Sequence, residues 1–114
     1  MVHEMQSDAV ESPLSVEKIV ESDRTVVAVI GEVDAASADR LRNAIIEVID
    51  GGQPRVTVDM RDVAFMDSSG LRVLIAGYKA AETAGGALTV RNPSDVVVRL
   101  LDITGQLSRF VPEI

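Results

Sequence analysis

Two kinds of segment alternate along this chain at short intervals: runs of β-branched apolar residues, and stretches whose apolar residues recur every three or four positions. The run from Thr25 to Ile30 is continuously apolar, which is typical of a central strand covered on both faces. Strands that alternate with helices predict an α/β domain in which helical crossovers make the later strands parallel. The expected order is β-β-α-β-α-β-α-β.

The elements are bounded by polar turns, glycine pairs and capping residues. Strands are predicted at residues 14–20, 25–30, 55–60, 87–90 and 107–111. Helices are predicted from the cap Ser37 to Gly51-Gly52, from the region of Ser68 to Gly85-Gly86, and from the cap Ser94 to Gly105. We expect a mixed sheet of four to five strands, its first two strands antiparallel, with helices mainly on one face.

The length and composition of the chain indicate its number of domains and the kind of protein it is. The chain has 114 residues and no cysteine, which predicts one domain without disulfides or thiolate metal sites. Residues 1–13 are predicted to be a polar tail that holds the single histidine, His3, and residues 14–114 the domain. The sequence shows neither a secretory signal pattern nor an apolar run of transmembrane length, so a cytoplasmic location is expected.

The charge narrows the range of partners. Eleven basic and eighteen acidic residues give a formal net charge of −7, which disfavours nucleic acid and anionic membrane surfaces. Only 3% of the residues are aromatic, so ligands that need stacking rings lose support. A protein partner fits this balance best, and no cofactor is expected.

Residues 62–71, Asp-Val-Ala-Phe-Met-Asp-Ser-Ser-Gly-Leu, carry the most distinctive chemistry. Two hydroxyls and a carboxylate stand where a strand ends and a helix begins, and a helix start presents free N–H groups and a positive dipole end to an attached phosphate. The segment is therefore a candidate phosphorylation switch. The alternative is capping alone, because Asp and Ser are preferred N-caps. Spacing leaves both readings open and does not choose between Ser68 and Ser69.

Enzyme classes that use similar residues lack their other parts. A serine-hydrolase elbow needs glycine where Met66 stands, and a histidine base, for which only His3 is present. A phospho-aspartate receiver holds Mg²⁺ on clustered carboxylates, but no lysine follows a late strand to complete it. Its candidate ligands would be Asp34, Asp59, Asp62 and Asp67. No phosphate-binding glycine loop is present, so neither catalysis nor nucleotide binding is expected.

The segment Gly31-Glu32-Val33-Asp34 and the segment Asp62 to Leu71, in this order and setting, resemble the STAS family of anti-sigma factor antagonists over residues 14–111. The resemblance implies a bacterial partner-switching protein. The unphosphorylated antagonist binds an anti-sigma factor, which is also a serine kinase, and thereby frees a sigma factor. Phosphorylation separates the pair and a phosphatase restores the antagonist. The protein would be a monomer or a weak homodimer.

Mapped onto this chain, the resemblance makes Ser68 the phosphoacceptor and Asp34 the loop aspartate before the first helix. The partner-binding and switch residues would be Asp34, Met66, Asp67, Ser69, Gly70, Leu71 and Arg72. Phosphate adds roughly −1.5 to −2 charge beside Asp67, so we expect a local electrostatic switch and no refolding.

Two departures from the family and one alternative function complete the expectation. The family often has a further helix after the last strand, and without it apolar surface near Leu107, Phe110 and Val111 would be exposed or paired with another copy. Arg72 stands where relatives commonly have small residues, which would alter the partner that fits. The alternative is a STAS interaction module of another pathway, such as a stressosome scaffold or a lipid-transport accessory subunit.

Overall fold

A computed structural model describes residues 14–112 of the chain. Its four strands are β1 (Ser15–Val20), β2 (Thr25–Val33), β3 (Arg55–Met66) and β4 (Ala87–Arg91), and they lie side by side in the order β1-β2-β3-β4. β1 and β2 pair antiparallel, whereas β2–β3 and β3–β4 pair parallel. The predicted mixed sheet with an opening hairpin is confirmed.

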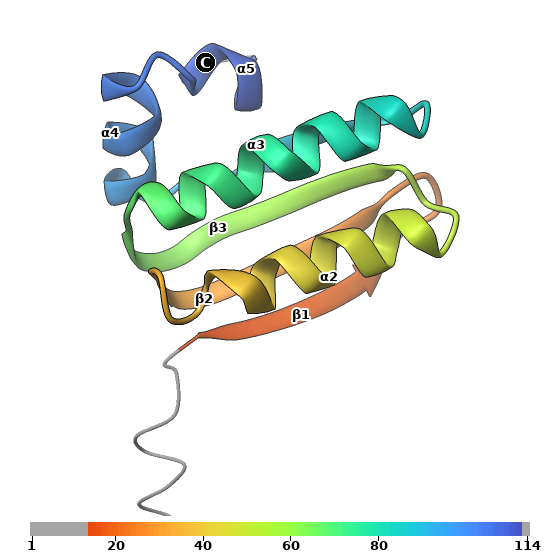
Figure 1. The fold of residues 1–114 in the computed structure, drawn as a ribbon, viewed down its shortest axis with the longest axis horizontal. Coiled ribbons are helices and arrows are strands. Elements are labelled where there is room, and N and C mark those ends of the chain that lie inside the picture. Colours follow the sequence, from red (N-terminus) through yellow and green to blue (C-terminus); the bar gives the residue numbers. More distant parts are fainter. Residues whose placement is uncertain (1–13, 113–114) are drawn as a thin grey trace, which may run out of the picture.

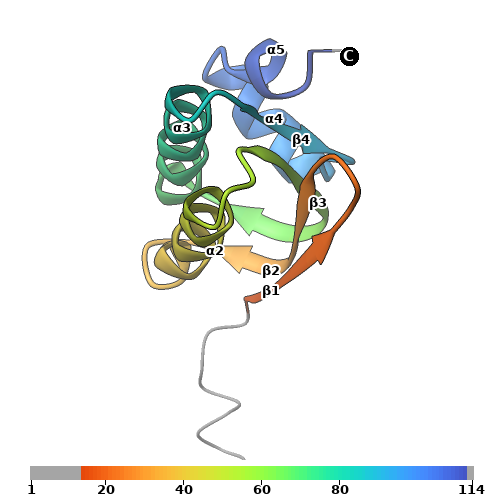
Figure 2. The same cartoon turned by 90° about the vertical axis from the view of Figure 1, so that its right-hand side faces the viewer.

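The two longest helices cover one face of this sheet. α2 (Ala38–Asp50) and α3 (Ser68–Thr83) run side by side across it, and both begin at the same end of the molecule (Figures 1 and 2). α4 (Asp95–Ile103) contacts β3, and the short α5 (Leu107–Phe110) contacts β4 and α4. The expectation that helices lie mainly on one face is confirmed.

Aliphatic side chains fill the space between sheet and helices, as the low aromatic content requires. Strand residues that face the helices alternate with residues of the other face, for example Val27 and Val29 in β2. Leu41, Ile45 and Leu74 supply the helical side of the core and are fully buried. The direction and position of α2 and α3 are fixed by this packing.

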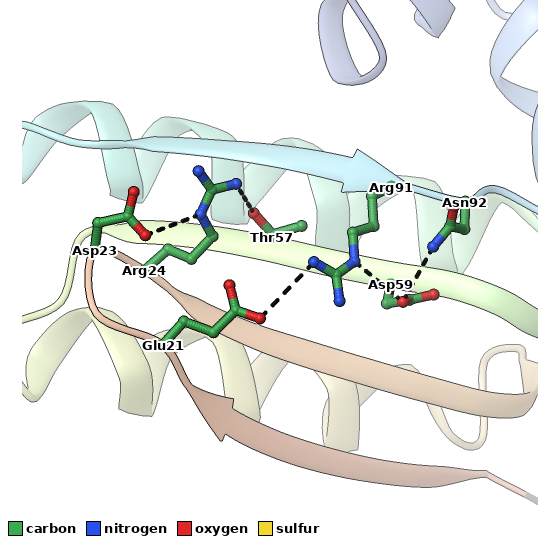
Figure 3. Close-up of polar contacts among 7 residues, drawn as sticks. All are labelled: Glu21, Asp23, Arg24, Thr57, Asp59, Arg91 and Asn92. Atoms are coloured by element: carbon green, nitrogen blue, oxygen red, sulfur yellow. Dashed lines mark hydrogen bonds and ion pairs between the residues drawn. The ribbon is translucent and has the colours of Figure 1, made fainter.

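The face of the sheet without helices carries a polar network (Figure 3). Arg91 Nε donates to Asp59 Oδ2 at 3.2 Å, and the same guanidinium lies 3.9 Å from Glu21 of the β1–β2 turn. Arg24 donates to the Thr57 hydroxyl at 3.3 Å. These contacts tie the turn before β2 to β3 and β4.

Two strands extend further than the sequence pattern predicts. β2 continues past Ile30 to Val33, because Gly31 adopts a φ of 114° at an irregularity in the register that leaves the pairing with β3 intact beyond it. β3 likewise continues from Met60 to Met66. The predicted ends of these two strands at residues 30 and 60 are therefore wrong.

The predicted strand at residues 107–111 is wrong as well, because this segment forms α5. Leu107, Phe110 and Val111 have helical spacing, which directs them to one side of a short helix. Phe110 is fully buried and its ring meets the ring of Tyr78 edge-on, with centroids 5.7 Å apart. Leu107 and Val111 are partly buried, so the expected exposed apolar surface at this end is not formed.

Candidate functional site

The carboxyl ends of β2 and β3 bring two loops together. Val33 pairs with Met66 at the end of the parallel ladder, and the Asp67 N–H donates to the Val33 carbonyl at 3.2 Å. The loop that opens α2 and the turn that opens α3 consequently lie at one edge of the sheet, where both helices begin (Figure 1). The candidate site is built at this edge.

Asp67 caps the start of α3. Its backbone is extended, and its Oδ1 accepts a hydrogen bond from the Ser69 N–H at 2.8 Å. Its carbonyl accepts from the Gly70 and Leu71 N–H groups at 3.1 and 3.2 Å. Asp67 and Ser69 thus hold the helix start in place, as capping predicts.

Ser68 is the first residue of α3 and its side chain is exposed. Within the described part of the chain, its hydroxyl has no hydrogen-bond partner. The hydroxyl therefore has no structural bond to lose on modification, and it stands at the positive end of the helix dipole. Ser69 differs, because its N–H is held by Asp67 and its side chain is partly buried.

Met66 and Gly70 lie beneath the helix start. Met66 is buried, and a Cβ at Gly70 would lie 2.5 Å from Met66 Cγ and 2.9 Å from Val33 Cγ1. Glycine is required at position 70 because α3 approaches the ends of both strands so closely. These two predicted site residues support the helix start and present little surface of their own.

Asp34 organises the loop before α2. Its Oδ1 accepts from the N–H groups of Ala36 and Ser37 at 3.0 and 3.1 Å. The buried Ser37 hydroxyl donates to the Glu32 carbonyl at 2.8 Å and accepts from the Asp34 N–H at 3.0 Å. Ser37 occupies the predicted N-cap position, but its side chain does not cap the helix. Hydrogen bonds among its own residues and to the Glu32 carbonyl therefore hold the loop before α2.

Ser94 shows the same difference between position and bonding. It is the N-cap residue of α4, as predicted, yet its hydroxyl donates to the Val63 carbonyl of β3 at 2.7 Å and makes no cap bond. This bond ties the start of α4 to β3 near the candidate site. Both serines are therefore held by tertiary hydrogen bonds that local spacing does not reveal.

Leu71 and Arg72 differ in exposure. Leu71 packs partly buried against the core, whereas Arg72 is exposed and lines a groove of about 620 Å³ between α2 and α3. Ser69 stands at the start of this groove, and its charged rim also includes Asp39, Arg42 and Lys79. Asp39, Arg42 and Lys79 are not among the site residues predicted from the sequence. For Lys79 a signal is present, because Arg72, Ala76 and Lys79 are spaced so that they lie along one face of α3.

The four carboxylates considered for a receiver-type Mg²⁺ site, an alternative that the sequence disfavours, do not form a metal-binding cluster in the described residues. Among residues 14–112, no group of three or more His, Cys, Asp or Glu side chains could hold a metal ion. Asp59 is hydrogen-bonded to Arg91 on the face of the sheet without helices. The carboxylates of Asp34 and Asp67 accept hydrogen bonds from backbone N–H groups. His3 lies outside the described residues.

The fold and the site define a small α/β domain with a mixed sheet, whose distinctive chemistry is one exposed serine at a helix start. A family model described as STAS domain matches residues 15–113, so the chain belongs to the STAS domain family. No helix within the described range combines the length and the apolar character needed to cross a membrane.

Known proteins similar to this chain include anti-sigma factor antagonists. A Bacillus subtilis protein named anti-sigma-B factor antagonist is 37% identical over 79 residues, covering 69% of this chain and 72% of its own length. An anti-sigma factor antagonist of Mycobacterium paratuberculosis has 28% identity and a TM-score of 0.72, covering 86% and 83% of the two chains. The phosphorylated form of the Bacillus cell fate determinant SpoIIAA has 22% identity and a TM-score of 0.65, covering 82% and 84%.

Proposed function

We propose that this protein is an anti-sigma factor antagonist, a regulatory and non-enzymatic protein of the bacterial cytoplasm. Unphosphorylated, it binds an anti-sigma factor that is also a serine kinase, and the anti-sigma factor then releases its sigma factor. Phosphorylation of Ser68 by that kinase dissolves the complex, and a phosphatase restores it. The antagonist names of the relatives support this assignment.

The observation that carries the proposal is the placement of Ser68. Its exposed hydroxyl forms no hydrogen bond in the described chain, whereas Ser37 and Ser94 in neighbouring loops are bonded to backbone carbonyls. A kinase needs an accessible hydroxyl on a backbone that survives modification. Asp67 already fixes that backbone through the Ser69 N–H, so a phosphate on Ser68 leaves the helix start intact.

Charge then provides the switch. A phosphate adds roughly −1.5 to −2 charge at a surface where the Asp67 carboxylate already lies next in sequence. A partner that fits a neutral hydroxyl would have to desolvate this concentrated negative charge, which opposes binding without a change of fold.

The test uses each purified kinase-type anti-sigma factor encoded in the source genome. We expect one of them to bind the wild-type chain and, with ATP, to add one phosphate that mass spectrometry maps to Ser68. Ser68→Ala should bind the same protein without being phosphorylated, and Ser68→Asp should bind it more weakly. The proposal fails when no anti-sigma factor binds the wild type, or when Ser68→Ala is phosphorylated to the same extent.

A further inference from the structure

The groove between α2 and α3 has an unusual charge for this molecule. Three cationic side chains, Arg42, Arg72 and Lys79, line it together with a single carboxylate, Asp39, although the whole chain carries a net charge of −7. Apart from Ser69, the lining between the charges is apolar and consists of Ala35, Ala38, Val73, Ile75 and Ala76. The groove is thus an apolar channel with a mostly positive rim.

The positive charges of Arg42, Arg72 and Lys79 are not paired with carboxylates of the described chain. In residues 14–112, none of them forms an ion pair, whereas Lys18, Arg24 and Arg91 each contact a carboxylate. Cationic side chains along an apolar channel on an acidic protein attract a segment of opposite charge and repel one of like charge.

We propose that this groove is the docking surface for an acidic amphipathic segment of a partner protein, and that Arg72 conveys the state of Ser68 to it. The occupant places apolar side chains against the apolar lining of the groove and carboxylates against Arg42 and Lys79. The role of Arg72 rests on the function proposed above, because it requires phosphate on Ser68.

Helix geometry connects Ser68 to the groove. Ser68 and Arg72 are separated by four positions in α3, so their side chains lie on one face of the helix, one turn apart. A phosphate on Ser68 has oxygens that pair with a guanidinium through charge-assisted hydrogen bonds. Arg72 has no competing ion pair in the described chain. It therefore pairs with the phosphate, and the groove loses the positive charge of Arg72.

The docking surface is tested with the full chain and a probe peptide, a synthetic amphipathic helix made of leucine, alanine and glutamate. The same peptide with lysine in place of glutamate is the matched control. In NMR titrations, the glutamate peptide should shift the amide signals of Ala38 and Ala76, and the shifts should weaken with added salt. The surface assignment is overturned when the lysine peptide binds equally well, or when neither peptide shifts these signals.

Charge variants sharpen the result, because one of them should strengthen binding. Arg42→Glu should weaken the glutamate peptide about tenfold, and Asp39→Lys should tighten it by a similar factor. Arg99→Glu and Asp102→Lys, at exposed positions of α4, make the same changes in net charge away from the groove. Equal effects from the α4 variants would reduce the interaction to net charge and overturn the proposal.

The coupling is tested with phosphoserine incorporated at position 68 during translation, which needs no kinase. In ³¹P NMR titrations, the phosphate should lose its last proton at lower pH in the wild type than in Arg72→Gln, and the glutamate peptide should bind the phosphorylated chain more weakly. Identical ³¹P titrations would overturn the role of Arg72. Failure of the proposed function has a different signature, since it would show as absence of an anti-sigma factor that binds.

Discussion

The Asp67 carboxylate accepts a hydrogen bond from the Ser69 N–H at 2.8 Å, so the residue before Ser68 holds the start of α3 in place. We expect Asp67→Ala to lower the free energy of unfolding by about 1 kcal/mol, because one of the free N–H groups at the start of α3 loses its acceptor. Asp67→Asn keeps an acceptor oxygen and should recover most of this loss. Urea unfolding of the three proteins measures it, and equal stability of all three would contradict the capping role.

Three serines at the same edge of the fold should respond differently to alanine. Ser37→Ala and Ser94→Ala remove hydroxyls that donate to backbone carbonyls, so each should destabilise the protein by roughly 1–3 kcal/mol. Ser68→Ala removes a hydroxyl that has no partner in the described chain and should change stability by less than about 0.5 kcal/mol. Thermal unfolding of the three variants decides the point, and a large loss for Ser68→Ala would mean a structural role.

These serines also show where sequence reasoning stops. Residue type and spacing correctly place Ser37 and Ser94 at helix starts, because N-cap preferences are local. Their actual acceptors, the carbonyls of Glu32 and Val63, are set by how loop and strand pack in three dimensions. Local patterns therefore predicted most of the helices and strands and the antiparallel pairing of the first two strands, but not these bonds.

The errors in the fold have related causes. The strand predicted at residues 25–30 continues to Val33, because a positive φ at Gly31 allows an irregular step in the pairing with β3. Residues 107–111 are short and apolar, a pattern that fits a strand or a helix turn equally well. The helix is favoured by the packing of Phe110, for example against Tyr78, which is distant in sequence and so cannot be inferred from the local pattern. The groove was missed because its rim comes from two helices whose alignment only the packed structure gives.

A side chain at position 70 should destabilise the fold while Met66 is present. A Cβ at position 70 would lie 2.5 Å from Met66 Cγ and 2.8 Å from its Sδ, so Gly70→Ala should cost about 1–3 kcal/mol despite the better helix propensity of alanine. A double-mutant cycle supplies the control. In a Met66→Ala background, which removes both atoms, the same glycine substitution should cost markedly less, as measured by chemical unfolding. An unchanged cost would assign the strain to Val33 or to the helix backbone.

Asp59 should make stability depend on pH. Burial by itself raises the pKa of this carboxyl, but hydrogen bonds from the Arg61 N–H, Arg91 and Asn92, together with the charge of Arg91, lower the pKa below its ordinary value overall. A carboxylate whose pKa is lower in the folded than in the unfolded state stabilises the fold above the unfolded pKa, near 3.9. That contribution is lost as the pH falls through the folded value.

Asp59→Asn should therefore lower the free energy of unfolding by roughly 1–3 kcal/mol at neutral pH, because the donors around position 59 lose a charged acceptor. The difference between wild type and variant should shrink as the pH falls below about 4. Asp50→Asn, at an exposed position with no ion pair in residues 14–112, is the matched control and should change the free energy of unfolding by less than about 0.5 kcal/mol at neutral pH. Urea unfolding across this pH range measures both variants, and a wild-type advantage at position 59 that grows on acidification would show that the carboxylate is not held in its charged form.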